Sequence, residues 1–539
     1  MKKGTVIVGI NTGHDGGAAI SIDGVIKCAI SEERLNRKKY SPGYINSFFY
    51  CLNALNLRIK DISSVVFSSY GKKLPPRYRG ELEPLGIPQE KFITVDHHLS
   101  HAFTAYFLSP FDDALVLVID ARGNGNSAES YYVAKGQEIK KIGGNSNKRN
   151  PAKGIGKTYD SFTNFLGWIN QEAGKTMALS SYGDCSSINT PLFSLNGIQV
   201  GGALDYEYEK GVMEFSKKYA LGFGEPYQKG KTPSSRKAAA YVQRETERIV
   251  LSLVDRLVKK TGKRKLCFAG GVALNCCVNG KLIQSGILDD IFIFPAASDR
   301  GQAVGNALYG FYKLKGYLPR KKLTNDYFGR SYTEKEIRST LEKKRKSIEQ
   351  NIPRKDFFFE KKRSIVKTAA KLISEGKTIG WFQGGSELGP RALGHRSILA
   401  DPRRKEMIKM VNEKIKHREW FRPFAPSCLS DKVPDYFRPK MKSPFMLFTF
   451  DVKPEKRQEI PAVLHKDNTA RVQTVTKKES GIFYELIKEF YRLTKVPLLL
   501  NTSFNSQGPI VETPEDALSV YLKTGLDYCV IGDFLVRKK

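Results

Sequence analysis

The chain has 539 residues, of which 40% are hydrophobic and 27% charged; this balance is typical of globular proteins, and the length predicts two domains, or three. No run approaches the roughly 18 apolar residues of a membrane span, and the apolar stretch near the start is too short for a signal peptide, so we expect a cytoplasmic protein. The formal net charge of +33 is spread along the chain, which favours a solvated basic surface, then anionic substrates, then nucleic acid.

The first part of the chain alternates short strands with polar turns. Runs of β-forming residues predict strands over 5–10, 18–22, 25–31, 64–68, 92–95 and 114–120. Asp23-Gly24 suits the tight turn of a hairpin between the second and the third. The pattern recurs in part later, as a helix over 235–261, a strand over 265–269 and a Gly-Gly turn before another helix. We therefore expect two α/β halves whose glycine-bearing turns suit nucleotide phosphates.

A lysine-rich, polar stretch over residues 320 to 360 marks the expected domain junction. We place the domains at 1–345 and 346–539. The second domain has its own predicted strands and helices, at 378–382, 496–501, 517–522 and 528–531. These are enough for a separate core.

The run Asp-His-His-Leu-Ser-His at 96–101 follows one of these predicted strands. If a helix begins there, His97 and His101 lie one turn apart on the same face, and both imidazoles reach one metal ion. His98 would then point elsewhere. The alternative is a helix start whose histidines are only polar caps.

Two aspartates are candidates to complete such a site. Asp120 ends a nearly continuous apolar run, which predicts a buried strand, and Asp299 follows a strand over 291–294. Carboxylates at that edge of an α/β sheet are common ligands. Two imidazoles with one or two carboxylates suit Fe²⁺, Mn²⁺ or Zn²⁺ better than Mg²⁺. Either aspartate alone is equally well explained as a helix cap.

Three glycine-bearing turns are further candidates. The turns at 270–275 and 301–306 permit close approach of phosphate and ribose, although neither matches a Walker loop or GxGxxG. A third turn, at 13–17, carries His14 between two strands. Because imidazole titrates near neutral pH, His14 could act as a general base toward a hydroxyl, or it could have no role.

The second half is dense in glycine and arginine, at 384–396 and 417–427. Arginines on constrained loops suit phosphate or carboxylate ligands, because the planar guanidinium makes bidentate contacts. Further on, an apolar strand ends in Asn501-Thr502-Ser503. These amide and hydroxyl groups could bind a carbamoyl group or phosphate oxygens, or simply form a turn.

Taken in order, these motifs resemble the O-carbamoyltransferase family of antibiotic biosynthesis and nodulation-factor modification. The resemblance covers nearly the whole chain and rests on GHDGGAA, EERLNRKK, HHLSH, AGGVALN, SDRGQAVGNA, GPRALGHRS, REWFRPFAPS and LNTSFN. It implies an α/β protein with an actin-like (ASKHA) ATPase-type N-terminal domain and a smaller α+β, YrdC-like C-terminal domain.

The resemblance also implies a reaction in two stages. Carbamoyl phosphate and Mg-ATP give carbamoyladenylate in the C-terminal domain. The adenylate then moves to the N-terminal domain, where a metal, usually iron, holds it while a hydroxyl of the acceptor attacks its carbonyl. We expect a small natural product as acceptor, bordered by residues 70–90 and 185–230, where no pattern identifies it.

The family's roles transfer to this chain position by position. The implied metal ligands are His97, His101, Asp120 and Asp299. His14 is the implied base, and the implied contacts to the nucleotide or acceptor are Lys39, Gly270, Gly271, Asn275 and Asp299. The implied set for carbamoyl phosphate and ATP is Arg391, Arg422, Arg471, Asn501 and Ser503.

Two other functions compete with this interpretation. A tRNA threonylcarbamoyl transferase shares the ATPase-type signature and would explain the charge, but the second-half motifs resemble the carbamoyl phosphate type and no RNA-binding module is recognisable. A nucleotide-switched binding module is the non-enzymatic alternative. Nucleic acid is therefore not among the expected partners, whereas a homo-oligomer is compatible with the sequence. Residues 174–183 resemble the family segment only loosely.

Overall fold

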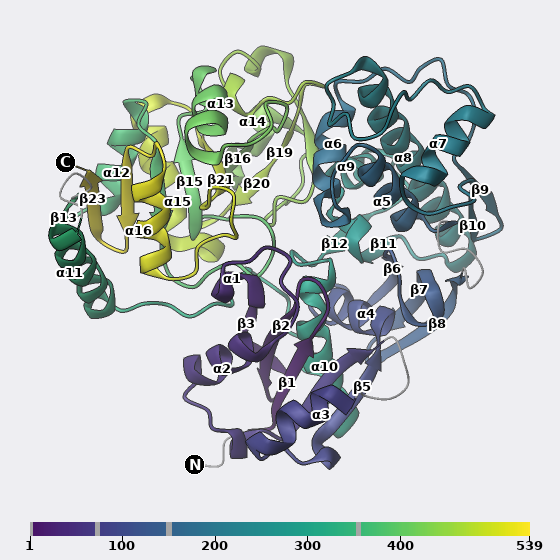
Figure 1. Ribbon diagram of the computed structural model, residues 1–539, viewed down its shortest axis with the longest axis horizontal. Helices are drawn as coiled ribbons and strands as arrows, with labels where there is room; N and C mark the ends of the chain where they lie inside the picture. The colour runs from purple at the N-terminus through teal and green to yellow at the C-terminus, as the bar shows by residue number, and fades with distance from the viewer. Residues whose placement is uncertain (1–3, 70–75, 147–152, 352–356, 539) are drawn as a thin grey trace. The chain divides into compact units, whose positions relative to one another are not determined.

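The computed structural model describes residues 4–69, 76–146, 153–351 and 357–538 (Figure 1). The chain divides into two compact units. Unit 1 comprises Met1–Glu32 and Pro42–Leu323, and unit 2 comprises Thr324–Lys539 together with an inserted segment, Glu33–Ser41. No helix among the described residues is long and apolar enough to cross a membrane.

Unit 1 contains two five-stranded sheets with the same topology. The first has the order β3-β2-β1-β4-β5 and consists of β1 (Val6–Asn11), β2 (Gly17–Ile22), β3 (Val25–Ser31), β4 (Ser64–Ser69) and β5 (Phe92–Asp96). Strands β1 to β3 form an antiparallel meander, and β4 and β5 follow in parallel on the other edge of β1.

The second sheet repeats this arrangement. Its order is β12-β11-β6-β7-β8, and it consists of β6 (Asp113–Ile119), β7 (Ser127–Lys135), β8 (Glu138–Ser146), β11 (Lys265–Ala269) and β12 (Asp290–Ile293). Again the first three strands are antiparallel, and the last two are parallel to the first. The two α/β halves expected from the sequence are confirmed, and the duplicated topology is that of an actin-like domain.

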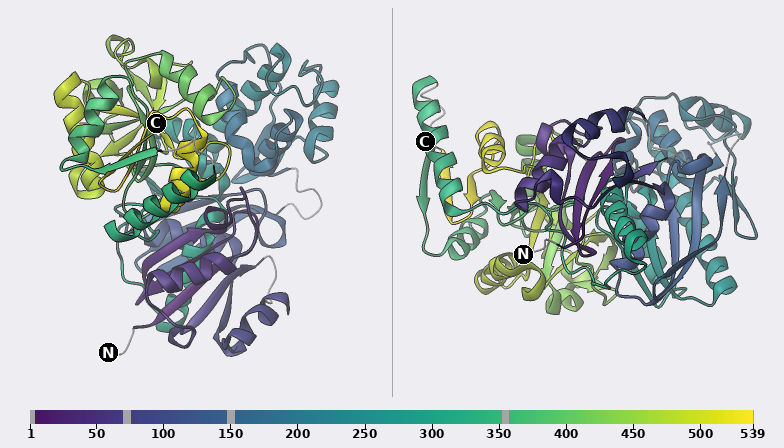
Figure 2. Two further views of the ribbon diagram at one scale, coloured as in Figure 1. Left: turned by 60° about the vertical axis from the view of Figure 1, so that its left-hand side comes forward. Right: turned by 90° about the horizontal axis from the view of Figure 1, so that it is seen from below.

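Helices cover these sheets and form an additional group. Near the first sheet lie α2 (Ile45–Ala54), α3 (Pro76–Leu82) and α10 (Gln302–Lys315), whereas α4 (His97–Phe107) packs on strands of both sheets. Helix α1 (Glu32–Asn36) leads into the segment Glu33–Ser41 of unit 2. The additional group consists of α5 (Ile155–Phe165), α6 (Ala173–Ser180), α7 (Tyr208–Lys218), α8 (Pro233–Thr261) and α9 (Cys276–Gln284). Both views of Figure 2 show this group, coloured blue to teal, standing together. A short hairpin, β9 (Phe193–Asn196) and β10 (Gln199–Gly202), adjoins it.

The long helix α8 begins and ends where its sequence provides caps. The Thr232 hydroxyl accepts a hydrogen bond from the Ser235 amide (3.2 Å), Pro233 occupies the first turn, and Gly262 follows the helix with φ +69°. Pro at the start and a left-handed Gly after the end are the ordinary signals of a helix. The helix predicted over 235–261 is thereby confirmed.

Unit 2 is built on an eight-stranded mixed sheet. In spatial order its strands are β13 (Phe357–Lys361), β23 (Phe534–Lys538), β22 (Tyr528–Ile531), β14 (Ile379–Phe382), β15 (Arg396–Ala400), β21 (Leu498–Ser503), β16 (Ala425–Leu429) and β20 (Gln473–Val475). A small sheet contains β17 (Phe437–Arg438), β18 (Thr449–Val452) and β19 (Thr469–Arg471). The larger helices are α11 (Glu334–Asn351), α12 (Ile365–Ser374), α15 (Lys477–Thr494) and α16 (Pro514–Lys523).

The division between the units lies earlier than the junction placed at residue 345 from the sequence. Tyr327 forms a β-bridge with Glu387, and α11 packs against α16, so residues 324–345 belong with unit 2. The polar, lysine-rich composition of this stretch does not reveal that it packs, because α11 turns only one face toward its neighbour.

The inserted segment lies in unit 2 because two arginines anchor it there. Arg34 is buried, and its Nη2 donates a hydrogen bond to the Gly389 carbonyl (2.9 Å). Arg37 donates to the carbonyls of Pro509 and Ile510, each at 2.7 Å. A guanidinium offers five donors in a rigid fork, which suits it to tie a short segment to carbonyls on separate loops.

Candidate functional site

Four side chains of unit 1 converge on one point. His97 Nε2 lies 3.4 Å from Asp120 Oδ2 and 3.1 Å from Asp299 Oδ1. His101 Nε2 lies 3.0 Å from Asp120 Oδ2 and 3.4 Å from Asp299 Oδ1. The four ligand atoms all lie within 4.8 Å of one another, and both imidazoles are buried. The structure thus brings together the four residues that the sequence singled out.

The local sequence explains how the two imidazoles meet. Asp96 ends β5, and its Oδ1 accepts a hydrogen bond from the Leu99 amide (3.0 Å), which begins α4 at the next residue. The helix therefore places His97 and His101 one turn apart. His98 points away, with Nδ1 2.8 Å from Ser130 Oγ, and burial lowers its pKa to about 3.

The geometry of this cluster fits a transition-metal ion. With metal–ligand bonds of about 2.1 Å, ligand atoms stand about 3.0 Å apart on an octahedron and about 3.4 Å apart on a tetrahedron. The observed nitrogen–oxygen separations span this range. Burial by itself would lower the pKa of His97, but the carboxylates of Asp299 and Asp120 outweigh it and raise that pKa to about 10. A buried point that attracts one positive charge so strongly suits a divalent cation.

His14 lies at the edge of the cluster. Its Nε2 is 3.7 Å from Asp299 Oδ2, and half of the side chain is exposed. The turn that carries it is tied down, because Asn11 Nδ2 donates to the carbonyls of Asp15 and Asp299, and Arg300 donates to the Asp15 carboxylate (2.9 Å). The expected base therefore stands beside the expected metal ligands, with access to solvent.

The glycine turn after β11 also borders the cluster. Gly270 has φ +87°, and a Cβ there would lie 2.2 Å from the carbonyl oxygen at the end of β6. A Cβ on Gly271 would lie 3.4 Å from Asp120 Oδ1. Asn275 follows this turn and exchanges hydrogen bonds with Gln243 through both of its polar atoms (3.1 and 3.0 Å). Glycine at 270 is thus required because this turn packs closely on the end of β6, and the Asn275 side chain is engaged within the protein.

In unit 2, the expected residues for carbamoyl phosphate and ATP gather at the end of β21. Asn501 and Ser503 alternate along that strand and share one face. Asn501 Nδ2 donates to the Ala392 carbonyl (3.0 Å), next to Arg391, and to Ser427 Oγ (2.9 Å). Its Oδ1 is buried and has no hydrogen-bond partner among the described residues.

Lys416 is a residue of this site that the sequence did not single out. It is buried, at the end of a π-helix (Val411–Lys416). Its ammonium donates to the carbonyl (2.7 Å) and hydroxyl (3.1 Å) of Ser503, and to the carbonyl (3.0 Å) and the side-chain oxygen of Asn505. The basic motif that follows it is visible in the sequence, but these partners lie nearly ninety residues further along.

Positive charges converge around Lys416. Burial lowers its pKa well below the ordinary value, and the charges of Arg418, Arg422 and Lys39 lower it further. Burial likewise lowers the pKa of Arg418, and Arg422 and Arg471 add to that effect. An anion such as a phosphate would offset this mutual repulsion. Lys39, expected at the nucleotide or acceptor, therefore joins the cations of unit 2 through the inserted segment.

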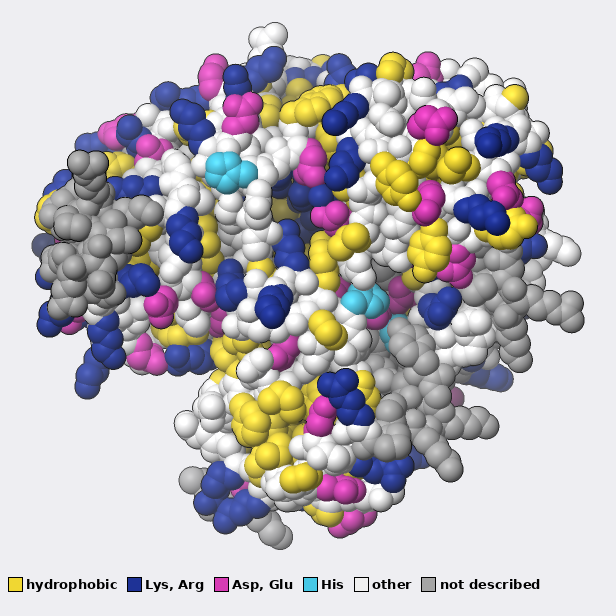
Figure 3. Space-filling view, viewed as in Figure 1, with side chains coloured by type: hydrophobic (Ala, Val, Ile, Leu, Met, Phe, Trp, Pro, Cys, Tyr) yellow, Lys and Arg dark blue, Asp and Glu magenta, His cyan; other side chains and the backbone are white. Residues whose placement is uncertain are grey.

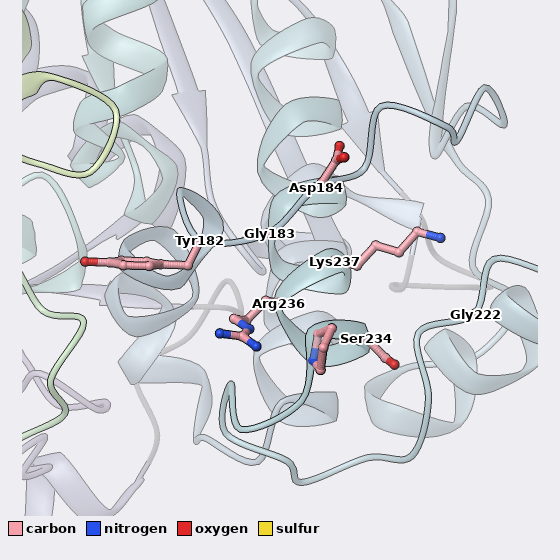
Figure 4. A pocket seen from close by; sticks show the side chains of 8 residues that line it. Tyr182, Gly183, Asp184, Gly222, Ser234, Arg236 and Lys237 are labelled. Atoms are coloured by element: carbon pink, nitrogen blue, oxygen red, sulfur yellow. The ribbon is translucent and has the colours of Figure 1, made fainter.

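The described residues show two further features, a dispersed basic charge and a pocket. Figure 3 shows lysines and arginines scattered over the visible face, in keeping with a solvated basic surface. Figure 4 shows a pocket of about 600 Å³ at the start of α8 in unit 1, and its lining residues are Tyr182, Gly183, Asp184, Gly222, Pro233, Ser234, Arg236 and Lys237. None of the individual site residues predicted from the sequence lines it, although Gly222 belongs to the range 185–230 that was expected to border the acceptor. Residues 70–75 of the other expected border lie outside the described residues.

A buried carboxyl on β7 gives a stability prediction. Glu129 Oε1 accepts a hydrogen bond from the Ile155 amide (2.9 Å) at the start of α5, and burial raises its pKa to about 7. Unfolded, the carboxyl titrates near pH 4.3, so the unfolded chain loses this proton first and the protein loses stability as pH rises from about 4 to 7. Glu129→Gln should remove roughly 2–3 kcal/mol of this pH dependence.

The measurement for Glu129→Gln is urea unfolding between pH 4.5 and 7.5. Glu138→Gln, on the exposed start of the next strand, is the matched control and should follow the wild type. Parallel pH profiles for the wild type and Glu129→Gln would contradict the prediction.

Comparison with known proteins identifies the class of enzyme. A family model described as the carbamoyltransferase N-terminus matches residues 84–308, and one described as the carbamoyltransferase C-terminus matches residues 370–538. The chain is 34% identical to nodulation protein NolNO of Sinorhizobium fredii, over 98% of this chain and 79% of that protein. It is 36% identical to nodulation protein NolO of Bradyrhizobium diazoefficiens, over 83% and 79%.

A further relative matches over nearly the full length of both proteins. The uncharacterised protein sll1178 of Synechocystis is 33% identical, over 99% of this chain and 97% of that protein. The protein is thus an enzyme that transfers a carbamoyl group. The chain belongs to the carbamoyltransferase family.

Proposed function

We propose that this carbamoyltransferase uses carbamoyl phosphate and ATP, through carbamoyladenylate, to carbamoylate a hydroxyl of a small-molecule acceptor. Activation is assigned to unit 2, which the family resemblance describes as YrdC-like, and transfer to unit 1. The observation that carries the proposal is the convergence of cations around Lys416, because both reactants of the activation step are polyanions.

The activation step converts carbamoyl phosphate, ATP and one water into carbamoyladenylate, phosphate and pyrophosphate. Lys416 and the neighbouring arginines offset the negative charge of the phosphates and orient them. The buried Oδ1 of Asn501 can accept a hydrogen bond from the carbamoyl NH₂ group. The Ser503 hydroxyl donates to Asn505 Oδ1 (2.7 Å), and it would have to redirect this hydrogen bond to contact a phosphate oxygen. Arg391 and Arg471 complete the proposed set.

The transfer step forms one C–O bond and breaks another. The acceptor oxygen attacks the carbamoyl carbon, its proton passes to His14 Nε2, and the bond to the phosphate of AMP breaks, so that AMP leaves with the electron pair. The turn at Gly270 and Gly271, which lies next to Asp120, is proposed to contact the phosphate of the adenylate. A divalent cation held by His97, His101, Asp120 and Asp299, with Fe²⁺ proposed first and Mn²⁺ or Zn²⁺ as alternatives, would supply Lewis-acid polarisation and charge neutralisation there.

The test supplies the purified protein with ¹⁴C-carbamoyl phosphate, ATP and a set of hydroxylated compounds. We expect release of pyrophosphate that requires carbamoyl phosphate, and a labelled carbamoyl ester when an acceptor is present. A protein that ignores carbamoyl phosphate but consumes threonylcarbamoyladenylate with tRNA would instead be a threonylcarbamoyl transferase. ATP binding without carbamoyl-phosphate-dependent pyrophosphate release would favour a nucleotide-switched binding module.

A further inference from the structure

Three neighbouring strands of unit 2 bring a polar trio together, which consists of Ser427, Gln473 and Asn501. Ser427 on β16 lies in register with Gln473 on β20, and β21, on the other side of β16, carries Asn501. Residues that oppose each other in a sheet, or that stand two apart along a strand, present their side chains to the same face. All three side chains are at most 1% exposed. Because buried polar groups need partners, the hydrogen bonds of the trio determine how each side chain is turned.

The loop that follows Glu387 supplies fixed acceptors to this trio. Glu387 is buried, and its Oε1 accepts hydrogen bonds from the amides of Leu393 (2.7 Å), His395 (3.0 Å) and Arg396 (3.3 Å). Three amides on one carboxylate oxygen hold the loop in a single fold, because hydrogen bonds to an ionised group are strong. The carbonyls of Ala392 and Leu393 are thereby turned toward the polar trio.

These two carbonyls set the direction of every hydrogen bond in the trio. A carbonyl oxygen only accepts, so Gln473 turns its NH₂ group to the Leu393 carbonyl (2.9 Å). Gln473 Oε1 then faces the Ser427 hydroxyl, which donates to it (2.6 Å). The Ser427 oxygen is left to accept from Asn501 Nδ2 (2.9 Å). The same NH₂ group of Asn501 donates to the Ala392 carbonyl (3.0 Å) and lies 3.3 Å from Gln473 Oε1.

Asn501 therefore has its NH₂ group held within the protein, whereas its oxygen is left over. Oδ1 is buried, and none of the described residues donates a hydrogen bond to it. A buried acceptor without a donor is costly unless a bound molecule supplies that donor. A ligand with an N–H at this point satisfies the oxygen, whereas a ligand with a methyl group leaves it desolvated and unpaired.

Given the proposed function of unit 2, on which this inference rests, we propose that Gln473 is a positioning residue that selects a carbamoyl group over an acetyl group. It does so by fixing which end of the Asn501 amide faces the bound molecule, and Glu387 supports it by holding the loop. If the Asn501 amide turned over, its NH₂ group would meet the NH₂ group of the ligand, and two donors would face each other. Carbamoyl and acetyl groups have nearly the same size, so polarity distinguishes them better than space does.

The first experiment measures, by calorimetry, the binding of two stable analogues that form a matched pair. Phosphonoacetamide and 2-oxopropylphosphonate carry CH₂ in place of the bridging oxygen of carbamoyl phosphate and acetyl phosphate, so they differ from each other only in NH₂ against CH₃. The full chain should bind phosphonoacetamide about tenfold more tightly, or better, because only this compound offers a donor to Asn501 Oδ1. Equal affinities, or no binding of either compound, would overturn the inference.

The second experiment changes the positioning residue. Gln473→Met keeps the length of the side chain but removes both the donor to Leu393 and the acceptor for Ser427. The Ser427 hydroxyl then becomes free to donate to the Asn501 oxygen, where it competes with the NH₂ group of the ligand. We expect the affinities for the two phosphonates to approach each other, to within about threefold. Should Gln473→Met not fold, Gln473→Leu removes the same two groups.

A conservative variant should rescue the preference. Gln473→Glu keeps the polarity of the trio, because a buried carboxyl is protonated, donates through its O–H to the Leu393 carbonyl and accepts from Ser427 through its other oxygen. It should therefore bind phosphonoacetamide preferentially, as the wild type does. A wild-type preference in folded Gln473→Met, or an equal loss of preference in the glutamate and methionine variants, would overturn the role of Gln473.

Gln383 provides a matched control. It is a buried glutamine directly after β14, and its Nε2 donates to the Gly532 carbonyl (2.9 Å). Gln383→Met removes a hydrogen bond of the same kind from unit 2 without touching the polar trio, so it should keep the wild-type preference. A purely structural defect weakens the binding of both phosphonates alike, which makes the ratio of their affinities the measure of positioning. An equal fall of this ratio in Gln383→Met and Gln473→Met would contradict the proposal.

Failure of the proposed function would be recognised separately, because the two phosphonates bind without ATP, metal or turnover. If the wild type prefers phosphonoacetamide but lacks carbamoyl-phosphate-dependent pyrophosphate release, the proposed function fails and the role of Gln473 in recognising a carbamoyl group stands. If the release is present and Gln473→Met keeps the wild-type preference, the role of Gln473 fails and the proposed function stands.

Discussion

His97→Ala is expected to remove the divalent cation and to lower carbamoyl transfer by on the order of a thousandfold or more. The substitution deletes one of four ligand groups and leaves Asp120 and Asp299 close together in a buried site with one imidazole fewer. Carbamoyl-phosphate-dependent pyrophosphate release should persist, because the cations assigned to activation belong to unit 2. Metal content by mass spectrometry and the two half-reactions, assayed separately, measure this outcome.

The neighbouring histidine is the control for this substitution. His98 is equally buried but faces Ser130, so His98→Gln should retain the metal. The raised pKa of His97 adds a signature in pH: the imidazole is protonated near neutrality and must lose that proton to bind a metal, so metal affinity should rise with pH from 6 to 8. His97→Ala with unchanged metal content and unchanged transfer would show that the site is assigned wrongly.

The convergence of His97, His101, Asp120 and Asp299 could be predicted from the sequence because short-range rules determine most of it, whereas their role as metal ligands stays a prediction. Asp96 caps a helix, which fixes His97 and His101 on one face, and Asp120 ends a strand that is apolar along its length. Only the approach of Asp299 to the two histidines and Asp120 depends on the tertiary fold. The repeated α/β pattern that produces this fold was visible in the sequence. The periodicity of strands and helices therefore carried the prediction for unit 1.

The parts that the sequence did not reveal depend on long-range packing. Lys416 contacts Ser503 and Asn505, and no local pattern links positions so far apart. The sequence also does not show that the segment Glu33–Ser41 belongs to unit 2. Arg34 directly follows the strands of the first sheet in the chain, yet it donates a hydrogen bond to the Gly389 carbonyl. Composition marked the junction near 345, whereas the packing of α11 decides it. Such long-range contacts are determined by the topology of the fold, and the local preference of a sequence for helix or strand does not reveal them.

Lys416→Met is expected to lower the rate of carbamoyl-phosphate-dependent pyrophosphate release by on the order of a hundredfold or more. Metal binding in unit 1 should be unchanged. Methionine keeps most of the volume of the side chain but removes the charge that would face a phosphate. It also removes the ammonium that donates hydrogen bonds to the carbonyl oxygens of Ser503 and Asn505. The end of β21 is then no longer held in the position in which it is proposed to bind the phosphate. The loss should appear in kcat and in the KM for carbamoyl phosphate together.

Lys414 provides a matched control for Lys416, because it lies on the same π-helix and is exposed. Lys414→Met removes the same formal charge and should retain activity close to that of the wild type, since an exposed charge is screened by solvent. A melting temperature of Lys416→Met near that of the wild type, together with full metal content, would separate loss of chemistry from loss of fold. If Lys416→Met and Lys414→Met lower pyrophosphate release equally, overall charge rather than the buried ammonium drives activation, and the assignment of unit 2 would have to be withdrawn.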